Sequence, residues 1–241
     1  MGRIPSGTAW KILDLLEDYV SGGFARRRRE PVAADAANAG EAVSQPAVPG
    51  AEAHAEAGTD RLAEIAAVAE EAEACTRCAL SMNRRRSVPG EGAINPPVLL
   101  IGEGPGEEED ATGRPFVGRS GQYLDTWLKP IGLPRAQSFI ANCVKCRPPQ
   151  NREPHPDELN ACLPFLERQI AALRPKTILC LGRIAAQTLL GTDMSLSGLR
   201  SRVHQRKGIA LVVTYHPSAV LRDPSLRRPV WEDLKLLKTL F

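Results

Sequence analysis

The sequence predicts an α/β fold in which a mainly parallel central sheet is flanked by helices on both faces. Four short apolar runs have the character of buried strands, segments with helical spacing of apolar residues separate them, and the two kinds of segment alternate along the chain. Strands that alternate with helices form parallel sheets covered on both faces. In such folds ligands bind beyond the carboxyl ends of the strands.

Each element follows from its local pattern. The strands are expected at Pro97–Gly102, Phe139–Asn142, Thr177–Gly182 and Leu211–Thr214, where apolar residues run without interruption. Helices are expected at Asp60–Glu73, Ser120–Ile131, Pro156–Leu173, Arg183–Leu190 and Trp231–Leu240, where apolar residues recur at three- and four-residue intervals.

Composition divides the 241 residues into three parts. Residues 1–21 are expected to form an amphipathic helix, because apolar side chains recur at helical spacing between Trp10 and Val20. Residues 22–59 contain few large apolar side chains and are expected to be a flexible linker. The run Arg26–Arg29 in it fits either a solvated linker or an arm that tethers DNA. Residues 60–241 are expected to be the folded domain.

The charge and the cysteines limit the class of protein. A formal net charge of +3 is far below that of a histone-like nucleic-acid-binding protein, so any contact with nucleic acid must be local. Acidic residues interrupt the first apolar stretch, which predicts neither a membrane span nor a secretory signal, and we expect a cytoplasmic protein. Because cytoplasmic thiols stay reduced, six cysteines there indicate a metal or cofactor rather than disulfides.

Four of the cysteines have spacing that suggests metal ligation. Cys75 and Cys78 form a C-x-x-C pair at a predicted helix end, and Cys146 and Cys162 follow at wide spacing. Structural zinc sites usually contain two close pairs, whereas iron–sulfur sites tolerate spread ligands. Spacing alone leaves the type of metal open, and it leaves Cys143 as a competitor of Cys146.

Polar residues follow three of the predicted strands. Glu103 lies in a glycine-rich loop after the first strand, Asn142 ends the second, and His216 follows the fourth. The acidic run Glu107–Asp110 would repel a phosphate, which predicts a ligand that is uncharged there. Because the ends of parallel strands share one edge of the sheet, Glu103, Asn142 and His216 are expected around a single crevice.

These segments together resemble the family 4 uracil-DNA glycosylases, from about Cys75 to the C-terminus. The resemblance is carried by Gly102–Gly106, Gly113–Gly118, Asn142–Arg152 and His216–Ser218, in the family's order and approximate spacing. It implies the three-layer sandwich of that superfamily. It also implies a monomer that hydrolyses the N-glycosidic bond of uracil in single- or double-stranded DNA.

The resemblance further implies a structural 4Fe–4S cluster held by Cys75, Cys78, Cys146 and Cys162. Cys146 occupies the family's ligand position, and Cys143 stands where an aliphatic residue is common.

For the uracil pocket, the resemblance implies that Phe116 stacks on the base and that Asn142 binds its polar edge. The backbone at Glu103 and Gly104 would contact its carbonyls, and His216 would face O2, where a donor stabilises the negative charge that develops on the leaving base. Glu109 would lie near the base and help to exclude thymine.

The residue that positions water stays open. The best-studied family of uracil glycosylases has an Asp in its first motif, and this chain has Gly104 there. Glu103, Glu109 and Asn151 are the candidates for positioning water.

Contacts to DNA and alternative functions also stay open. Lys145, Arg147, Arg152 and the segment Leu221–Arg228 are candidates to touch the DNA backbone or to fill the gap left by a flipped base. The alternatives are a non-catalytic uracil binder, a relative that captures uracil-DNA covalently, for which His155 is the candidate nucleophile, and a protein related to phage polymerases.

Overall fold

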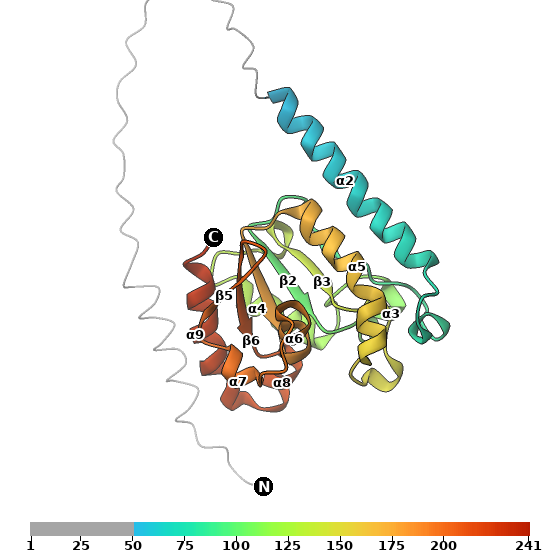
Figure 1. Cartoon of the computed structure of the whole chain (residues 1–241). Coiled ribbons are helices and arrows are strands. Elements are labelled where there is room, and N and C mark those ends of the chain that lie inside the picture. The colour runs from blue at the N-terminus through green and yellow to red at the C-terminus, as the bar shows by residue number, and fades with distance from the viewer. Residues whose placement is uncertain (1–50) are drawn as a thin grey trace, which may run out of the picture. The chain divides into compact units, whose positions relative to one another are not determined.

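The computed structural model describes residues 51–241, and their side chains from Asp60 onward. The predicted amphipathic helix at 1–21 and the predicted linker up to residue 50 lie outside this part. The described chain forms one sheet with helices on both of its faces (Figure 1).

The sheet has six strands in the order β1-β3-β2-β4-β6-β5. The strands are β1 (Glu91–Gly92), β2 (Val98–Gly102), β3 (Phe139–Asn142), β4 (Thr177–Leu181), β5 (Val203–Arg206) and β6 (Ile209–Thr214). The four predicted strands are confirmed, and as neighbours they are parallel.

Both edge strands are antiparallel, so the sheet is mixed rather than mainly parallel as predicted. β1 has only two residues, too few for a periodic pattern. β5 carries polar side chains and no buried residue, so it lacks the apolar run that marked the central strands. A tight turn with positive φ at Lys207 and Gly208 pairs β5 with β6 as a hairpin.

The helices are α2 (Ala51–Ala74), α3 (Glu107–Thr112), α4 (Arg119–Leu128), α5 (Pro156–Leu173), α6 (Arg183–Leu190), α7 (Leu196–Leu199), α8 (Pro217–Arg222) and α9 (Arg227–Lys238). Single 3₁₀ turns occupy Ala79–Met82, Arg135–Gln137, Pro149–Asn151 and Pro224–Leu226. α2 begins at Ala51 rather than at the predicted Asp60. The preceding residues are mostly Ala and Glu, which favour helix without contributing apolar spacing.

Two apolar cores lie on opposite faces of the sheet. Successive strand residues point to opposite faces, so Leu99 belongs to one core and Leu100 to the other. Residues of α4 and α9 complete the core of Leu100, and residues of α5 and α6 complete the core of Leu99. The predicted cover of both faces is therefore confirmed (Figure 1).

α2 packs against α5. Val68 and Ala72 of α2 share an apolar cluster with Phe165 of α5. Arg168 of α5 adds ion pairs to Glu64 at 2.7 Å and Glu71 at 2.6 Å. The last turn of α2 buries Ala72 and delivers Cys75 beside α5. Within residues 51–241, no helix combines the length and the apolar character needed to cross a membrane.

Candidate functional site

A pocket of about 430 Å³ lies where the carboxyl ends of β2 and β3 meet the loop after β6. Gly102 pairs directly with Asn142 across the parallel strands, so the two strands end at the same level. The lining residues include every predicted substrate and catalytic residue: Glu103, Gly104, Glu109, Phe116, Asn142, Asn151 and His216. The predicted convergence of distant turns is therefore present in the structure.

Asn142 presents an unpaired hydrogen-bond acceptor at the pocket. Its side chain is 1% exposed, and its Oδ1 atom has no hydrogen-bond partner within the described chain. Gly102 permits this arrangement, since a Cβ there would lie 2.4 Å from Oδ1. Leaving a buried acceptor unpaired costs about 1–3 kcal/mol, and a ligand that donates a hydrogen bond to this oxygen would remove that cost.

Phe116 forms an apolar wall of the same pocket. Its ring centroid lies 5.6 Å from that of His216, with 36° between the ring planes. A Cβ at Gly102 would come within 2.6 Å of the Phe116 ring, so glycine is required for this approach as well. The pocket therefore offers a flat aromatic surface beside the unpaired acceptor, an arrangement suited to a planar polar ring.

His216 is the N-cap residue of α8. Its Nδ1 atom accepts a hydrogen bond from the Ser218 amide at 3.2 Å and lies 2.8 Å from the Ser218 hydroxyl. An acceptor Nδ1 assigns the ring proton to Nε2. Burial, and then the positive charge of Arg222, lower the pKa of His216 to about 4. The imidazole is therefore neutral at pH 7 and can donate from Nε2.

The three candidates for positioning water differ in the hydrogen bonds that their side chains already accept within the protein. Glu109 accepts from the amides of Val117 at 2.8 Å, Gly118 at 2.9 Å and Gly106 at 3.1 Å, so both of its carboxylate oxygens are occupied. The Asn151 Oδ1 atom accepts from Arg147 Nε at 3.0 Å.

Glu103 is the exception. Its carboxylate accepts no hydrogen bond from any residue that the structure describes. Burial and the negative charge of Glu153 raise its pKa to about 7, against a lowering effect of Arg183. At neutral pH the Glu103 carboxyl is therefore partly protonated and partly ionised.

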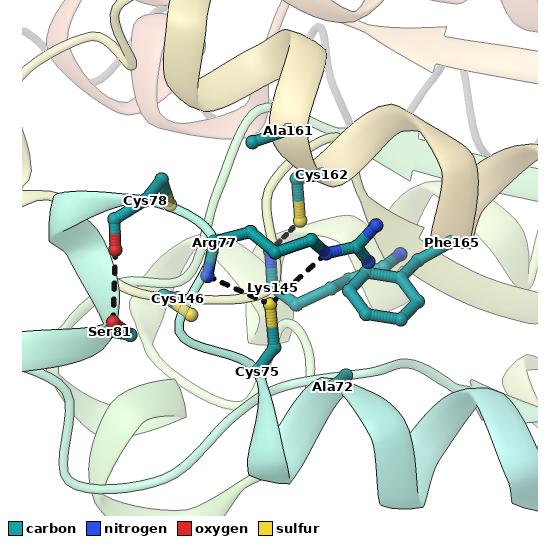
Figure 2. Close-up of a pocket in the computed structure, with 10 residues that line it drawn as sticks. All are labelled: Ala72, Cys75, Arg77, Cys78, Ser81, Lys145, Cys146, Ala161, Cys162 and Phe165. Carbon is teal, nitrogen blue, oxygen red and sulfur yellow. Dashed lines mark hydrogen bonds between the residues drawn. The ribbon is translucent and has the colours of Figure 1, made fainter.

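The four predicted metal ligands line a second, separate pocket (Figure 2). Cys75 and Cys78 follow the end of α2, Cys146 lies in the loop after β3, and Cys162 lies on α5. Cys143 is buried instead in the apolar core of Leu99 and does not line this pocket. The structure thus groups Cys146, not Cys143, with the other three thiols.

Nitrogen donors surround these sulfurs. Arg84 Nη1 lies 3.0 Å from Cys146 Sγ, the Lys145 amide lies 3.2 Å from Cys162 Sγ, and the amide and Nε of Arg77 lie 3.5 Å from Cys75 Sγ. Figure 2 shows the Arg77 guanidinium lying over the Phe165 ring beside Cys75.

The donor set fits an iron–sulfur cluster. Four thiols with N–H groups directed at them match the sites that bind such clusters. Within residues 60–241, no three His, Cys, Asp or Glu side chains converge closely enough to hold one metal ion.

Three of the basic residues expected to touch DNA contact other groups of the protein. The expectation for Lys145 is wrong: its side chain is buried, and Nζ donates to the Asn142 carbonyl at 2.9 Å and to Gln169 at 2.7 Å. Arg152 pairs with the buried Glu158 at 2.6 Å. Arg147, besides Asn151, contacts Glu107 at 3.4 Å.

Of the segment Leu221–Arg228, one residue reaches the pocket. Leu221 is 39% exposed, and its neighbour Arg222 lines the pocket. The sequence assigned no role to Ser218, whose amide and hydroxyl both contact His216 Nδ1, because no helix was expected after His216. His155 is exposed at the N-cap of α5 and does not line the pocket.

Comparison with known proteins agrees with this geometry. Residues 89–235 match the family model of the uracil DNA glycosylase superfamily. A type-4 uracil-DNA glycosylase of Pyrobaculum aerophilum is 44% identical, over 67% of this chain and 87% of the relative. Proteins of the same name from Sulfurisphaera tokodaii and Thermotoga maritima are 42% and 43% identical, over 72% and 75% of this chain and 83% and 95% of the relatives.

Proposed function

Because this chain belongs to the uracil-DNA glycosylase superfamily, we propose that it hydrolyses the N-glycosidic bond of uracil in DNA and leaves an abasic site. The observation that carries the proposal is the buried, unpaired Oδ1 of Asn142 beside the Phe116 ring. Uracil is planar and carries an N3–H donor between two carbonyls, so it complements both groups.

Recognition of the base follows from the lining residues. Phe116 stacks on the ring, Asn142 accepts from N3–H, and the backbone at Glu103 and Gly104 contacts the carbonyl oxygens. Glu109 lies beside the base and contributes to the exclusion of thymine by holding the loop with its three amide contacts.

His216 supplies the stabilisation of the leaving group. When the glycosidic bond breaks, negative charge develops on the base and positive charge on the sugar. A neutral imidazole that donates from Nε2 to uracil O2 stabilises that charge, and one such donor contributes about 10²- to 10³-fold in rate. The contact between Ser218 and Nδ1 keeps the proton on the nitrogen that faces the base.

Glu103 is our candidate for the residue that positions the attacking water. Glu109 and Asn151 are already engaged by backbone amides and by Arg147, whereas the Glu103 carboxylate is free of such partners in the described chain. As an anion it orients water by accepting from it and opposes the positive charge on the sugar.

The substrate is uracil-containing DNA, single- or double-stranded, bound by a monomer. The base leaves the stack to enter the pocket, at a cost of a few kcal/mol. Arg222, which lines the pocket, and its exposed neighbour Leu221 are our candidates to contact phosphate and to fill the gap.

Cys75, Cys78, Cys146 and Cys162 would hold a 4Fe–4S cluster. When bound, that cluster would supply a structural cross-link between α2, the loop after β3 and α5. A cytoplasmic location belongs to the proposal, since the thiols must stay reduced to bind iron.

The test is incubation of the purified chain with a uracil-containing oligonucleotide, followed by alkali. Strand breaks at the uracil position are the expected result. A shifted band that survives denaturation would instead indicate covalent capture, and intact DNA without such a band would indicate a binder. An oligonucleotide with thymine in place of uracil is the control and should stay intact.

A further inference from the structure

The turn that carries Phe116 holds a backbone conformation that costs free energy. The φ angle of Phe116 is +52°, in the left-handed region that bulky side chains rarely adopt. The start of α4 also approaches this turn closely, because a Cβ at Gly121 would lie 1.8 Å from the Phe116 carbonyl oxygen. Such a conformation persists only where surrounding groups enforce it.

Arg135, on the 3₁₀ turn before β3, is one of those groups. Its guanidinium donates to the Phe116 carbonyl at 3.0 Å and also to the Pro115 carbonyl. The same side chain pairs with Glu91 of β1 at 3.1 Å and with Asp125 of α4 at 3.3 Å. The carboxylates of Glu91 and Asp125 thus hold the Arg135 guanidinium in place, and its other N–H groups donate to the carbonyls of Pro115 and Phe116.

Glu109 acts on the same turn from the other end. Its Oε1 atom accepts from the Val117 amide at 2.8 Å, while Arg135 binds the Phe116 carbonyl. These two groups belong to one peptide unit, which is planar and rigid. Binding both of its ends therefore fixes its orientation, and with it the direction in which the Phe116 side chain leaves the backbone.

We propose that Arg135 is a positioning residue for recognition of the base: it holds the Phe116 ring against the pocket through the carbonyls of Pro115 and Phe116. This inference rests on the proposed function, in which that ring stacks on uracil. A guanidinium presents several donors in a planar fork, whereas the ammonium of Lys is a point charge and does not reproduce the paired contact.

The experiment compares Arg135→Met, Arg135→Lys and Arg114→Met in release of uracil from a single-stranded oligonucleotide. Arg114 is the matched control, because it also pairs with Glu91, at 2.8 Å, but touches neither carbonyl. We expect Arg135→Met to lower kcat/KM by about 10- to 100-fold, since a small misplacement of a positioning group has such effects. Arg135→Met should also raise the inhibition constant for free uracil. Arg135→Lys should give values of both quantities between those of Arg135→Met and the unmodified chain, and Arg114→Met should give the values of the unmodified chain.

A double variant separates positioning from general stability. If Arg135 acts through the ring, Arg135→Met should add less than about twofold to the loss caused by Phe116→Ala, because contacting residues couple. The inference would be overturned if the kcat/KM losses of the two single variants multiplied in the double variant. It would also be overturned if Arg135→Met kept the kcat/KM and the uracil inhibition constant of the unmodified chain. If Arg135→Met does not fold, Arg135→Lys decides on the same two readouts. An unmodified chain that releases no uracil would instead refute the proposed function.

Discussion

At the scale of single residues, the pocket combines groups that the fold satisfies with groups that it leaves open. The Glu109 carboxylate and the Asn151 amide oxygen are bound within the protein. Asn142 Oδ1 and the Glu103 carboxylate face the pocket without such partners in the described chain. Since buried polar groups in folded proteins are nearly always paired, the buried Oδ1 atom of Asn142 is the point in the pocket where a donor of the substrate is expected.

Replacement of Asn142 tests the recognition of the base. Asn142→Ala should lower kcat/KM for uracil release by about 10- to 100-fold, the equivalent of the 1–3 kcal/mol that an unpaired buried donor costs. Asn160→Ala, on the exposed side of α5, is the control and should retain the unmodified rate. Equal rates for the two variants would remove Asn142 from the recognition of uracil.

Glu103 should make stability depend on pH. Its pKa in the folded protein is raised from 4.5 to about 7, so its stabilising contribution is complete below pH 4.5 and is lost as pH rises through 7. Glu103→Gln removes this loss and should raise the free energy of unfolding at pH 8 by about 1–3 kcal/mol, with little change at pH 4.5. Urea titrations at both pH values measure it. Glu70, exposed on α2, is the control, and Glu70→Gln should leave the free energy of unfolding unchanged at both pH values. An equally unchanged free energy of unfolding for Glu103→Gln would contradict the raised pKa of Glu103.

At the scale of elements, the sequence predicts those strands and helices whose buried apolar residues form a recognisable pattern. β2, β3, β4 and β6 were predicted because their side chains are buried on both faces. β1 and β5 were missed because hydrogen bonds to a neighbouring strand define them, and neither buries a side chain fully. The start of α2 was missed because an Ala- and Glu-rich helix has no apolar period.

The candidate site shows the same limit. Convergence of Glu103, Asn142 and His216 follows from parallel topology, which makes strand ends meet. The direction of the Lys145 side chain does not follow from the topology. A basic residue in a loop gives no sign that its ammonium is buried and donates to the Asn142 carbonyl. The link between Arg135 and Phe116 depends on backbone torsions that no local pattern specifies.

The grouping of the cysteines gives a prediction for these elements. Cys146→Ser should lose most of the bound iron, because its sulfur lines the pocket of thiols. Cys143→Ser should retain about four irons per chain, because Cys143 is buried in the separate core of Leu99. Elemental analysis and visible absorption of anaerobically purified protein measure both. Iron kept by Cys146→Ser and lost by Cys143→Ser would reverse the assignment, and zinc in the unmodified chain would reject the cluster.

At the scale of the whole molecule, the pocket at the strand ends and the pocket of thiols are linked through one residue. Lys145 joins the two sites, since its amide contacts Cys162 and its ammonium contacts the Asn142 carbonyl. The pocket itself depends on three segments far apart in the chain, those that end in Glu103, Asn142 and His216. Recognition of one base, as we propose it, therefore requires these three segments together.

The most direct test is the initial rate of free uracil release from a single-stranded oligonucleotide between pH 5 and 8. We expect release by the unmodified chain and a rate about 10²- to 10³-fold lower for His216→Ala. The ratio between the two should be constant, because His216, with a pKa lowered to about 4, stays neutral over this range. His155→Ala, at the exposed N-cap of α5, should keep the unmodified rate. A His216→Ala rate equal to that of the unmodified chain would contradict the account.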